Sequence, residues 1–173
     1  MPKKKEPKPT ELLLTFANQI RSVPHDPRLQ IIIAQGMLEL LVNTLVEKFC
    51  KGAEMIDADD RSFPYLVKLV ILHEKGLIPD NYFKWMNGLR KIRNAAAHAA
   101  VFELEKLTPK YWTPFRGLKA TLTNYPLDDP KNFVYLCQEM VSGFWNLHVR
   151  FFAPIFEPQL FEKKDENKKS PPA

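Results

Sequence analysis

The apolar residues of this 173-residue chain recur mainly at helical spacing. Side chains three and four positions apart share one face of a helix, so stripes at this spacing predict helices with one buried side. No segment shows the alternation of apolar and polar residues that indicates a half-buried strand. The pattern therefore predicts an all-α protein, an up-and-down bundle of four to five main helices.

Caps and breaks locate the predicted helices. Asp26 followed by Pro27 is typical of a helix start, and Gly76 of a helix end. The helix that begins at Pro27 is apolar around most of its circumference, so we expect it at the centre of the bundle. The predicted helices span residues 11–22, capped by Thr10, then 27–51, ended by Gly52, then 64–75, 80–99 and 130–152, with a short helix near 111–122 and an acidic loop at 53–62.

Both ends of the chain are polar and contain several prolines. We expect residues 1–9 and 157–173 to be disordered tails around a single helical domain, residues 10–156. The first tail, which includes "PKKKEPKP", has four lysines and one glutamate, so it carries +3 of the formal net charge of +5. A nuclear signal or a nucleic-acid arm could have this composition, although a solubilising tail is the simpler interpretation. Because the remainder of the chain is nearly neutral, we do not expect DNA binding.

The cysteines and acidic residues suggest no disulfide framework and no metal site. Cys50 and Cys137 lie far apart in apolar helical segments, as expected for buried, reduced thiols of a cytoplasmic protein. Asp57, Asp59 and Asp60 lie together, but no second acidic or histidine set has ligand spacing. We therefore expect no metal and no other cofactor. No apolar run reaches 18 residues, so no membrane segment is expected.

The candidate chemistry lies in "LRKIRNAAAHA", residues 89–99. Arg90, Asn94 and His98 are spaced by four and form a row along one helix face. Arg93 flanks the row, about 140° around an ideal helix from His98. The two converge only if Arg93 bends back, if the helix is distorted, or if a second subunit contributes.

Small residues surround this row: Ala95, Ala96, Ala97, Ala99 and Ala100. They leave room for a neighbouring helix to approach closely and to shield the histidine from water. In a symmetric homodimer, that neighbour could be the same helix of the second chain, which would bring two rows together.

The row contains the groups that metal-free RNA cleavage requires. A histidine can transfer a proton, guanidinium groups can bind phosphate, and an asparagine can orient either. Attack by the 2′-hydroxyl of RNA on its own phosphate needs no more than this. The same spacing also fits a solvated helix edge with an asparagine and a histidine in structural roles, and spacing alone does not decide between the two.

"LRKIRNAAAH" resembles the signature of the HEPN superfamily, an arginine, a polar residue and a histidine after four to six positions. Here these are Arg93, Asn94 and His98. The wider segment, roughly residues 27–100, is similar to the branch that includes the mannitol operon repressor family. The resemblance implies a helical bundle that dimerises, with the motifs of two chains meeting in one cleft.

In active members, such a cleft is a metal-independent endoribonuclease, and many members are toxins or defence effectors, some controlled by an antitoxin. By this resemblance, Arg93 would stabilise the phosphate, His98 would transfer a proton and Asn94 would orient the site. Arg90 lies outside the signature, and its place in the row makes it a candidate substrate-binding residue. The alternative is a non-catalytic regulatory or protein-interaction module of the mannitol operon repressor type.

For several other aromatic residues and histidines, the sequence allows more than one role. Tyr111, Trp112 and Phe115 could stack on unpaired bases, although such residues more often close a core. Two further histidines, His25 and His73, are expected to be structural, and His148 could face the cleft.

Overall fold

The computed structural model describes residues 11–157, and within them the fold is all-α, as predicted. Residues 11–157 contain no β-strand, only one isolated antiparallel bridge between Lys119 and Pro126. Four short 3-10 helices supplement the α-helices. The α-helices are α1 (Glu11–Arg21), α2 (Pro27–Phe49), α3 (Ala53–Ala58), α4 (Tyr65–Glu74), α5 (Asp80–His98), α6 (Phe133–Leu147) and α7 (Val149–Phe156).

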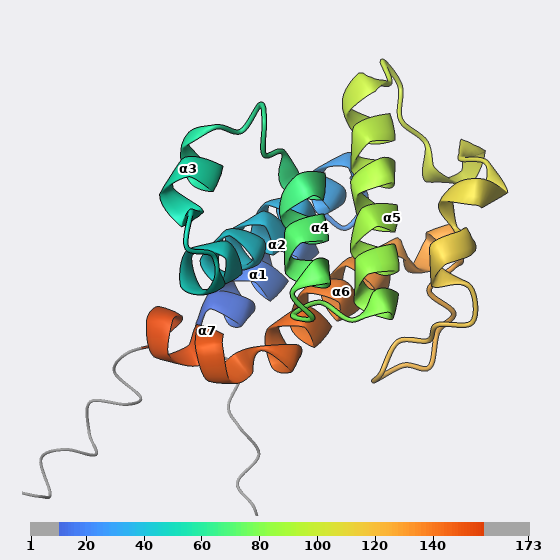
Figure 1. Ribbon diagram of the computed structural model, residues 1–173. Helices are drawn as coiled ribbons and strands as arrows, with labels where there is room; N and C mark the ends of the chain where they lie inside the picture. Colours follow the sequence, from blue (N-terminus) through green and yellow to red (C-terminus); the bar gives the residue numbers. More distant parts are fainter. Residues whose placement is uncertain (1–10, 158–173) are drawn as a thin grey trace, which may run out of the picture.

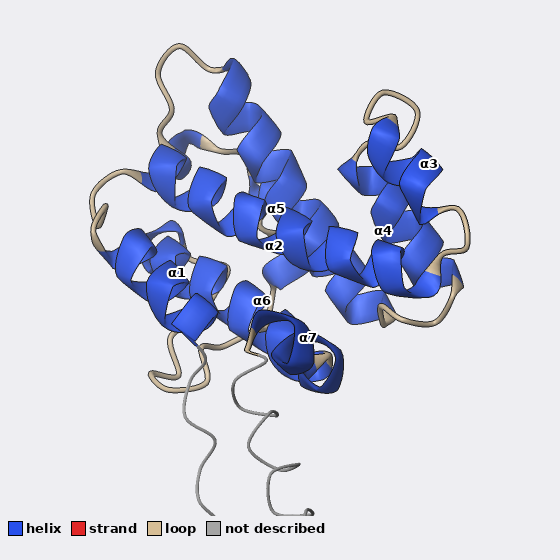
Figure 2. Cartoon of the chain, turned by 90° about the vertical axis from the view of Figure 1, so that its left-hand side faces the viewer, coloured by secondary structure: helices blue, strands red, loops and turns tan. Residues whose placement is uncertain are grey.

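Helix α2 occupies the centre of the molecule, as its apolar circumference predicted. It packs against α1, α3, α4, α5 and α6 (Figure 2). Its start is also as predicted, because the Asp26 side chain accepts a hydrogen bond from the Leu29 backbone N–H at 2.9 Å. By length and composition α2 could cross a membrane, but 61% of its most apolar window is buried inside the fold. The central helix of a globular domain has the same properties.

Helices α4 and α5 form an antiparallel pair across α2, with α5 ending at the top of the molecule in Figure 1. The turn between them depends on Gly76, whose φ of 71° is favourable only for glycine. Its N–H donates to the His73 carbonyl oxygen at 2.8 Å, and the Leu77 N–H donates to the Leu72 carbonyl oxygen at 2.9 Å. These two bonds make a Schellman motif, so the predicted end of this helix is confirmed.

The segment after α2 differs from the prediction. Residues 53–58 form helix α3 instead of a loop, and Gly52 is its N-cap residue instead of the end of α2, which already stops at Phe49. Ile56 is buried on the inner side of α3. The acidic composition hid this short helix, because only Ile56 and Ala53 of its residues pack against the core.

The predicted helix near 111–122 does not form. Two 3-10 helices, Pro109–Tyr111 and Thr113–Phe115, are followed by an irregular loop. The prolines at 109 and 114 each lie in the first turn of one of them, where their missing N–H costs nothing, and their spacing prevents one continuous helix. This segment packs directly on α5, because a Cβ atom on Gly88 would lie 2.8 Å from the Phe115 ring.

The predicted helix 130–152 is divided into three parts. A 3-10 helix (Pro130–Asn132) precedes α6, and the chain bends at His148, whose ψ of 17° ends α6 before α7 begins. The folded part also extends past the expected boundary, since Glu157 is buried and accepts a hydrogen bond from the Glu11 N–H at 2.9 Å. The expected Thr10 cap and both expected tails, apart from Glu157, lie outside the described residues.

Both cysteines are buried and free, as predicted. Burial raises the pKa of the Cys137 thiol well above its ordinary value, which keeps it protonated and unreactive.

Candidate functional site

A surface groove of about 520 Å³ runs along the C-terminal half of α5. Arg90, Asn94 and His98 all line it, so the face that the spacing of four predicted is confirmed. We call this the His98 groove. Its other lining residues are Lys91, Ala95, Lys110 and Tyr111. The described lining therefore contains three cationic side chains and a histidine, but no carboxylate.

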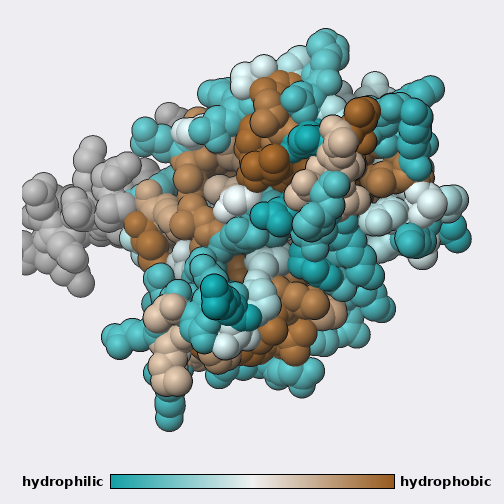
Figure 3. All heavy atoms as spheres, turned by 90° about the horizontal axis from the view of Figure 1, so that it is seen from above, coloured by the Kyte–Doolittle hydropathy of each residue, from teal (hydrophilic) through white to brown (hydrophobic). Residues whose placement is uncertain are grey.

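His98 is the last residue of α5, and its side chain is exposed. The helix end is held by Arg28, whose Nη2 donates to the carbonyl oxygen of Ala99 at 2.6 Å. The upper face of the molecule, toward which α5 ends, is mostly hydrophilic around compact apolar patches (Figure 3). Because His98 is exposed, solvent can reach the imidazole.

The alanines near the row of Arg90, Asn94 and His98 are not all covered by a neighbouring helix. Ala96 is buried against the core, whereas Ala97 and Ala100 are exposed. The expectation that a neighbouring helix shields His98 is wrong for the single chain. The close approach to α5 occurs instead at Gly88, where Pro114 and Phe115 pack.

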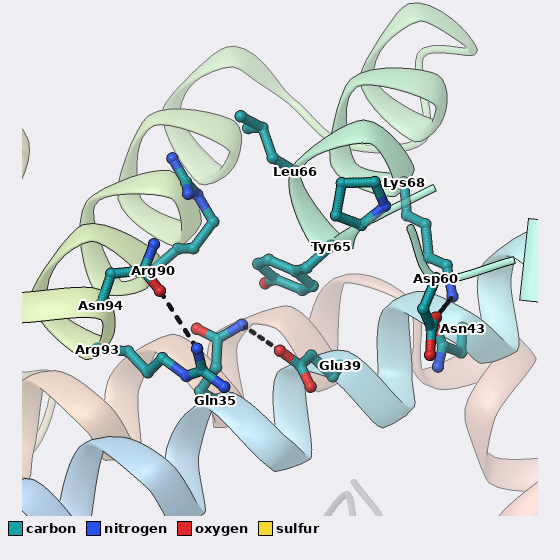
Figure 4. A pocket seen from close by; sticks show the side chains of 11 residues that line it. Gln35, Glu39, Asn43, Asp60, Tyr65, Leu66, Lys68, Arg90, Arg93 and Asn94 are labelled. Atoms are coloured by element: carbon teal, nitrogen blue, oxygen red, sulfur yellow. Dashed lines mark hydrogen bonds and ion pairs between the residues drawn. The ribbon is translucent and has the colours of Figure 1, made fainter. Parts of the chain in front are cut away.

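Arg93 does not line the His98 groove. It lines a cavity of about 480 Å³ between α2, α4 and α5, which we call the Arg93 cavity (Figure 4). Its Nη1 donates to the Oδ1 atom of Asn94 at 3.3 Å. A single chain therefore brings Arg93 to Asn94 but not into the groove that His98 lines, as the angle between them suggested.

Arg90 and Asn94 line both the His98 groove and the Arg93 cavity. The Arg90 guanidinium is oriented by Asn87, whose Oδ1 accepts from Nε at 3.0 Å. This bond leaves the two terminal nitrogens of Arg90 available for a bound anion. The two sites are thus neighbours that share one face of α5.

The Arg93 cavity contains two buried polar atoms without hydrogen-bond partners, Gln35 Oε1 and the Tyr65 hydroxyl. Gln35 is only 2% exposed, and its Nε2 donates to Glu39 Oε1 at 3.2 Å. Burial raises the pKa of the Tyr65 hydroxyl well above its ordinary value, and the adjacent Gln35 partly offsets this. The two side chains are thus close, but they do not meet in hydrogen-bond geometry.

Lys68 closes one end of the Arg93 cavity and is itself only 4% exposed. Its Nζ donates to Asn43 and Asp57, both at 3.1 Å, and lies 3.5 Å from Asp60. Asp57 of α3 and Asp60 just after it therefore hold a buried lysine. Within residues 11–157, no group of three or more histidine, cysteine, aspartate or glutamate side chains could hold a metal ion.

The aromatic residues after α5 divide between the two roles that the sequence left open. Trp112 and Phe115 are buried in the core. Tyr111 is partly exposed and lines the His98 groove beside Lys110. One of the three residues is therefore placed where it can contact a ligand.

The remaining histidines lie away from the groove. His73 Nε2 is 2.8 Å from Asp80 Oδ1 across the α4–α5 turn, and His25 is exposed beside the start of α2. His148 is buried among the rings of Phe144, Phe151 and Phe152, so it does not face the cleft.

Several residues of these two sites were missed by sequence reasoning. Lys110 follows an irregular segment whose path no spacing rule gives, whereas Tyr111 beside it was already a candidate for stacking on a base. Gln35 and Glu39 did offer a signal, since they are polar residues four apart within the otherwise apolar stretch 31–42. Polar groups in such a position need partners, and here they line a cavity.

Comparison of the chain with protein-family models, with curated proteins and with solved structures finds no match.

Proposed function

We propose that this protein is a HEPN-type, metal-independent endoribonuclease that acts as a homodimer. The observation that carries the proposal is the composition of the His98 groove. An accessible histidine lies in line with Arg90 and Asn94, beside Lys91, Lys110 and Tyr111, and no described carboxylate lines this groove. Cations attract the phosphates of RNA, and a tyrosine ring can stack on an unpaired base. The resemblance of Arg93, Asn94 and His98 to the HEPN signature is consistent with it.

The reaction uses the RNA as its own nucleophile. His98 accepts the proton of a 2′-hydroxyl, and the 2′-oxygen then forms a bond to the adjacent phosphorus. The bond from phosphorus to the 5′-oxygen breaks, and that oxygen takes up a proton from a second general acid. The products are a 2′,3′-cyclic phosphate and a 5′-hydroxyl, with no net oxidation and no metal. Guanidinium groups stabilise the charge on the phosphate in the transition state.

A homodimer accounts for the separation of Arg93 from His98. If the α5 helices of two chains pack through the exposed Ala97 and Ala100, Arg93 of one chain can approach His98 of the other. The second chain would also supply a second histidine to protonate the leaving oxygen. Light scattering should give a dimer for the wild type, and a bulky Ala97→Trp substitution should give a monomer without activity.

The proposed setting is the cytoplasm, where the enzyme acts on cellular RNA as a toxin or defence effector and an antitoxin or other protein partner holds it inactive. Expression of the wild type should then arrest growth, and His98→Ala should remove the arrest. The control is His25→Ala, which changes an exposed histidine outside the His98 groove. Growth arrest by the His98→Ala protein would contradict a toxic ribonuclease.

Incubation of purified protein with single-stranded RNA in EDTA tests the activity itself. The wild type and His25→Ala should cleave the RNA, whereas His98→Ala and Arg93→Ala should lose at least about a hundredfold in rate, the usual contribution of an acid–base group. Equal cleavage by His98→Ala would contradict the proposal.

A non-catalytic interaction module of the mannitol operon repressor type is the second candidate. It is favoured by an exposed stripe on α2, where Leu29, Ile32 and Leu40 are 40 to 50% exposed around Gly36. This stripe borders a largely apolar groove between α1 and α2. Under this alternative no RNA is cleaved, and Ile32→Glu abolishes binding of a protein partner in a pull-down, whereas His98→Ala does not.

A further inference from the structure

The Arg93 cavity is lined by a carboxylate and by two guanidinium groups that form no ion pair with it. Glu39 on α2 and the guanidinium groups of Arg90 and Arg93 on α5 line the same space (Figure 4). Among the ion pairs of residues 11–157, none involves any of these three residues. A carboxylate and two cations therefore face one cavity without pairing, and a ligand between them could contact both.

Hydrogen-bond acceptors and donors are separated across the cavity. The α2 side carries acceptors, the Glu39 carboxylate and the unpaired Oε1 of Gln35, a residue that is only 2% exposed. The α5 side carries donors from Arg90, Arg93 and the amide of Asn94. A complementary ligand must present donors along one edge and acceptors along another, and it must be small enough for about 480 Å³.

Guanine is the RNA base that fits this arrangement. Its N1–H and its N2 amino group are adjacent donors that a carboxylate can accept together, and its O6 and N7 atoms are adjacent acceptors for which arginine is the common partner. Adenine has no N1–H, and cytosine and uracil have no second donor beside their first. The Tyr65 hydroxyl, buried and unpaired, offers one further polar contact.

We propose that the Arg93 cavity is a guanine-binding subsite for the nucleotide next to the cleaved phosphate, with Glu39 as the residue that sets the base preference. This inference rests on the proposed ribonuclease function. The cavity shares Arg90 and Asn94 with the His98 groove. A strand with its base in the cavity therefore has its phosphate beside these shared residues, and the enzyme cleaves next to guanosines.

Nucleotide binding by the His98→Ala protein tests the subsite without any cleavage. Titration calorimetry with 3′-GMP, 3′-AMP, 3′-CMP and 3′-UMP should show at least about fivefold tighter binding of 3′-GMP, the smallest discrimination that a bidentate base contact gives. The inosine analogue, which lacks the N2 amino group, should bind more weakly than 3′-GMP. Equal binding of all four nucleotides, or binding of none, overturns the subsite.

Glu39→Gln should abolish the preference for 3′-GMP, because the amide replaces one acceptor with a donor. The matched control is Glu47→Gln on the same helix, an exposed residue outside the cavity, which should keep the preference. Circular dichroism should report an unchanged fold for both. A preference that survives Glu39→Gln overturns the assignment of Glu39.

The two proposals fail in different ways. Cleavage of RNA that depends on His98 but shows no preference for guanosine overturns the subsite alone. Binding of 3′-GMP that depends on Glu39, in a protein that does not cleave RNA, supports the subsite's guanine chemistry and overturns the ribonuclease.

Discussion

The Arg28 guanidinium donates a hydrogen bond to the carbonyl oxygen of Ala99 at 2.6 Å, which ties the first turn of α2 to the residue directly after His98. The last carbonyls of a helix have no partners within it, so a cation at this place satisfies one of them. The central helix of the fold therefore fixes the end of the helix that carries the candidate catalytic histidine.

Removal of the hydrogen bond between Arg28 and Ala99 should increase the mobility of the end of α5 more than it lowers the stability of the whole fold. We predict that Arg28→Met lowers the free energy of unfolding by about 1 to 3 kcal/mol, the cost of losing a charged hydrogen bond. Hydrogen exchange should accelerate at the amides of residues 95–99, and RNA cleavage should slow. Arg21→Met at an exposed position should change neither, and unaltered exchange in Arg28→Met would show that the bond does not hold the helix end.

The contact at Gly88 should be intolerant of any side chain. A Cβ atom there would lie 2.8 Å from Phe115 and 3.1 Å from Pro114, so Gly88→Ala should destabilise the protein by about 1 to 3 kcal/mol through overpacking. The matched change Gly36→Ala meets open space in α2 and should stabilise by about 0.5 to 1 kcal/mol. Urea unfolding of both variants measures the difference, and equal effects would contradict this packing.

The buried Lys68 should stabilise the segment around α3. Lys68→Met leaves Asp57 and Asn43 without their shared donor, and we expect a loss of about 2 kcal/mol. This is below the usual cost of breaking a buried pair, because the Asp60 side chain is 87% exposed and stays solvated. Chemical denaturation should show the loss, with Lys75→Met as an exposed control. A stability equal to that of the wild type would mean that the cluster contributes nothing.

His148 should make the fold less stable in acid. Burial lowers its pKa below the ordinary value of 6.5, helped by Arg150 and opposed by a hydrogen bond to the Leu77 backbone. The unfolded chain therefore binds a proton more readily, so stability is full above pH 6.5 and falls as the pH drops through the lower pKa of the folded state. His148→Gln should show a smaller loss of melting temperature between pH 7 and pH 5. An identical pH dependence in both proteins would exclude this role.

The positions of the long helices could be predicted because each has a local cause. Asp26 caps α2 and Gly76 ends α4 through contacts within a few residues, and the sequence contains both signals. The bend at His148 has no signal of this kind in the sequence. After α5, the prolines at 109 and 114 limit helix length, but they do not give the path of the segment, which packs Phe115 on Gly88.

For the candidate site, too, the sequence predicted the residues that lie on one helix but not those that other segments contribute. Spacing along one helix correctly placed Arg90, Asn94 and His98 on one face. It also correctly indicated that Arg93 points away from His98. It could not supply Lys110, which reaches the groove from another segment. Nor could it show that Glu39, on the helix expected at the centre of the bundle, lines the neighbouring cavity.

The measurement that tests the central claim most directly is a mass analysis of RNA products formed in EDTA. The wild type should release fragments with 2′,3′-cyclic phosphate and 5′-hydroxyl ends, and a 2′-deoxy nucleotide at the cleaved position should block the cut. His98→Ala should give intact RNA. Products with 3′-hydroxyl and 5′-phosphate ends, cleavage of the 2′-deoxy substrate, or cleavage by His98→Ala at the wild-type rate would each contradict the account.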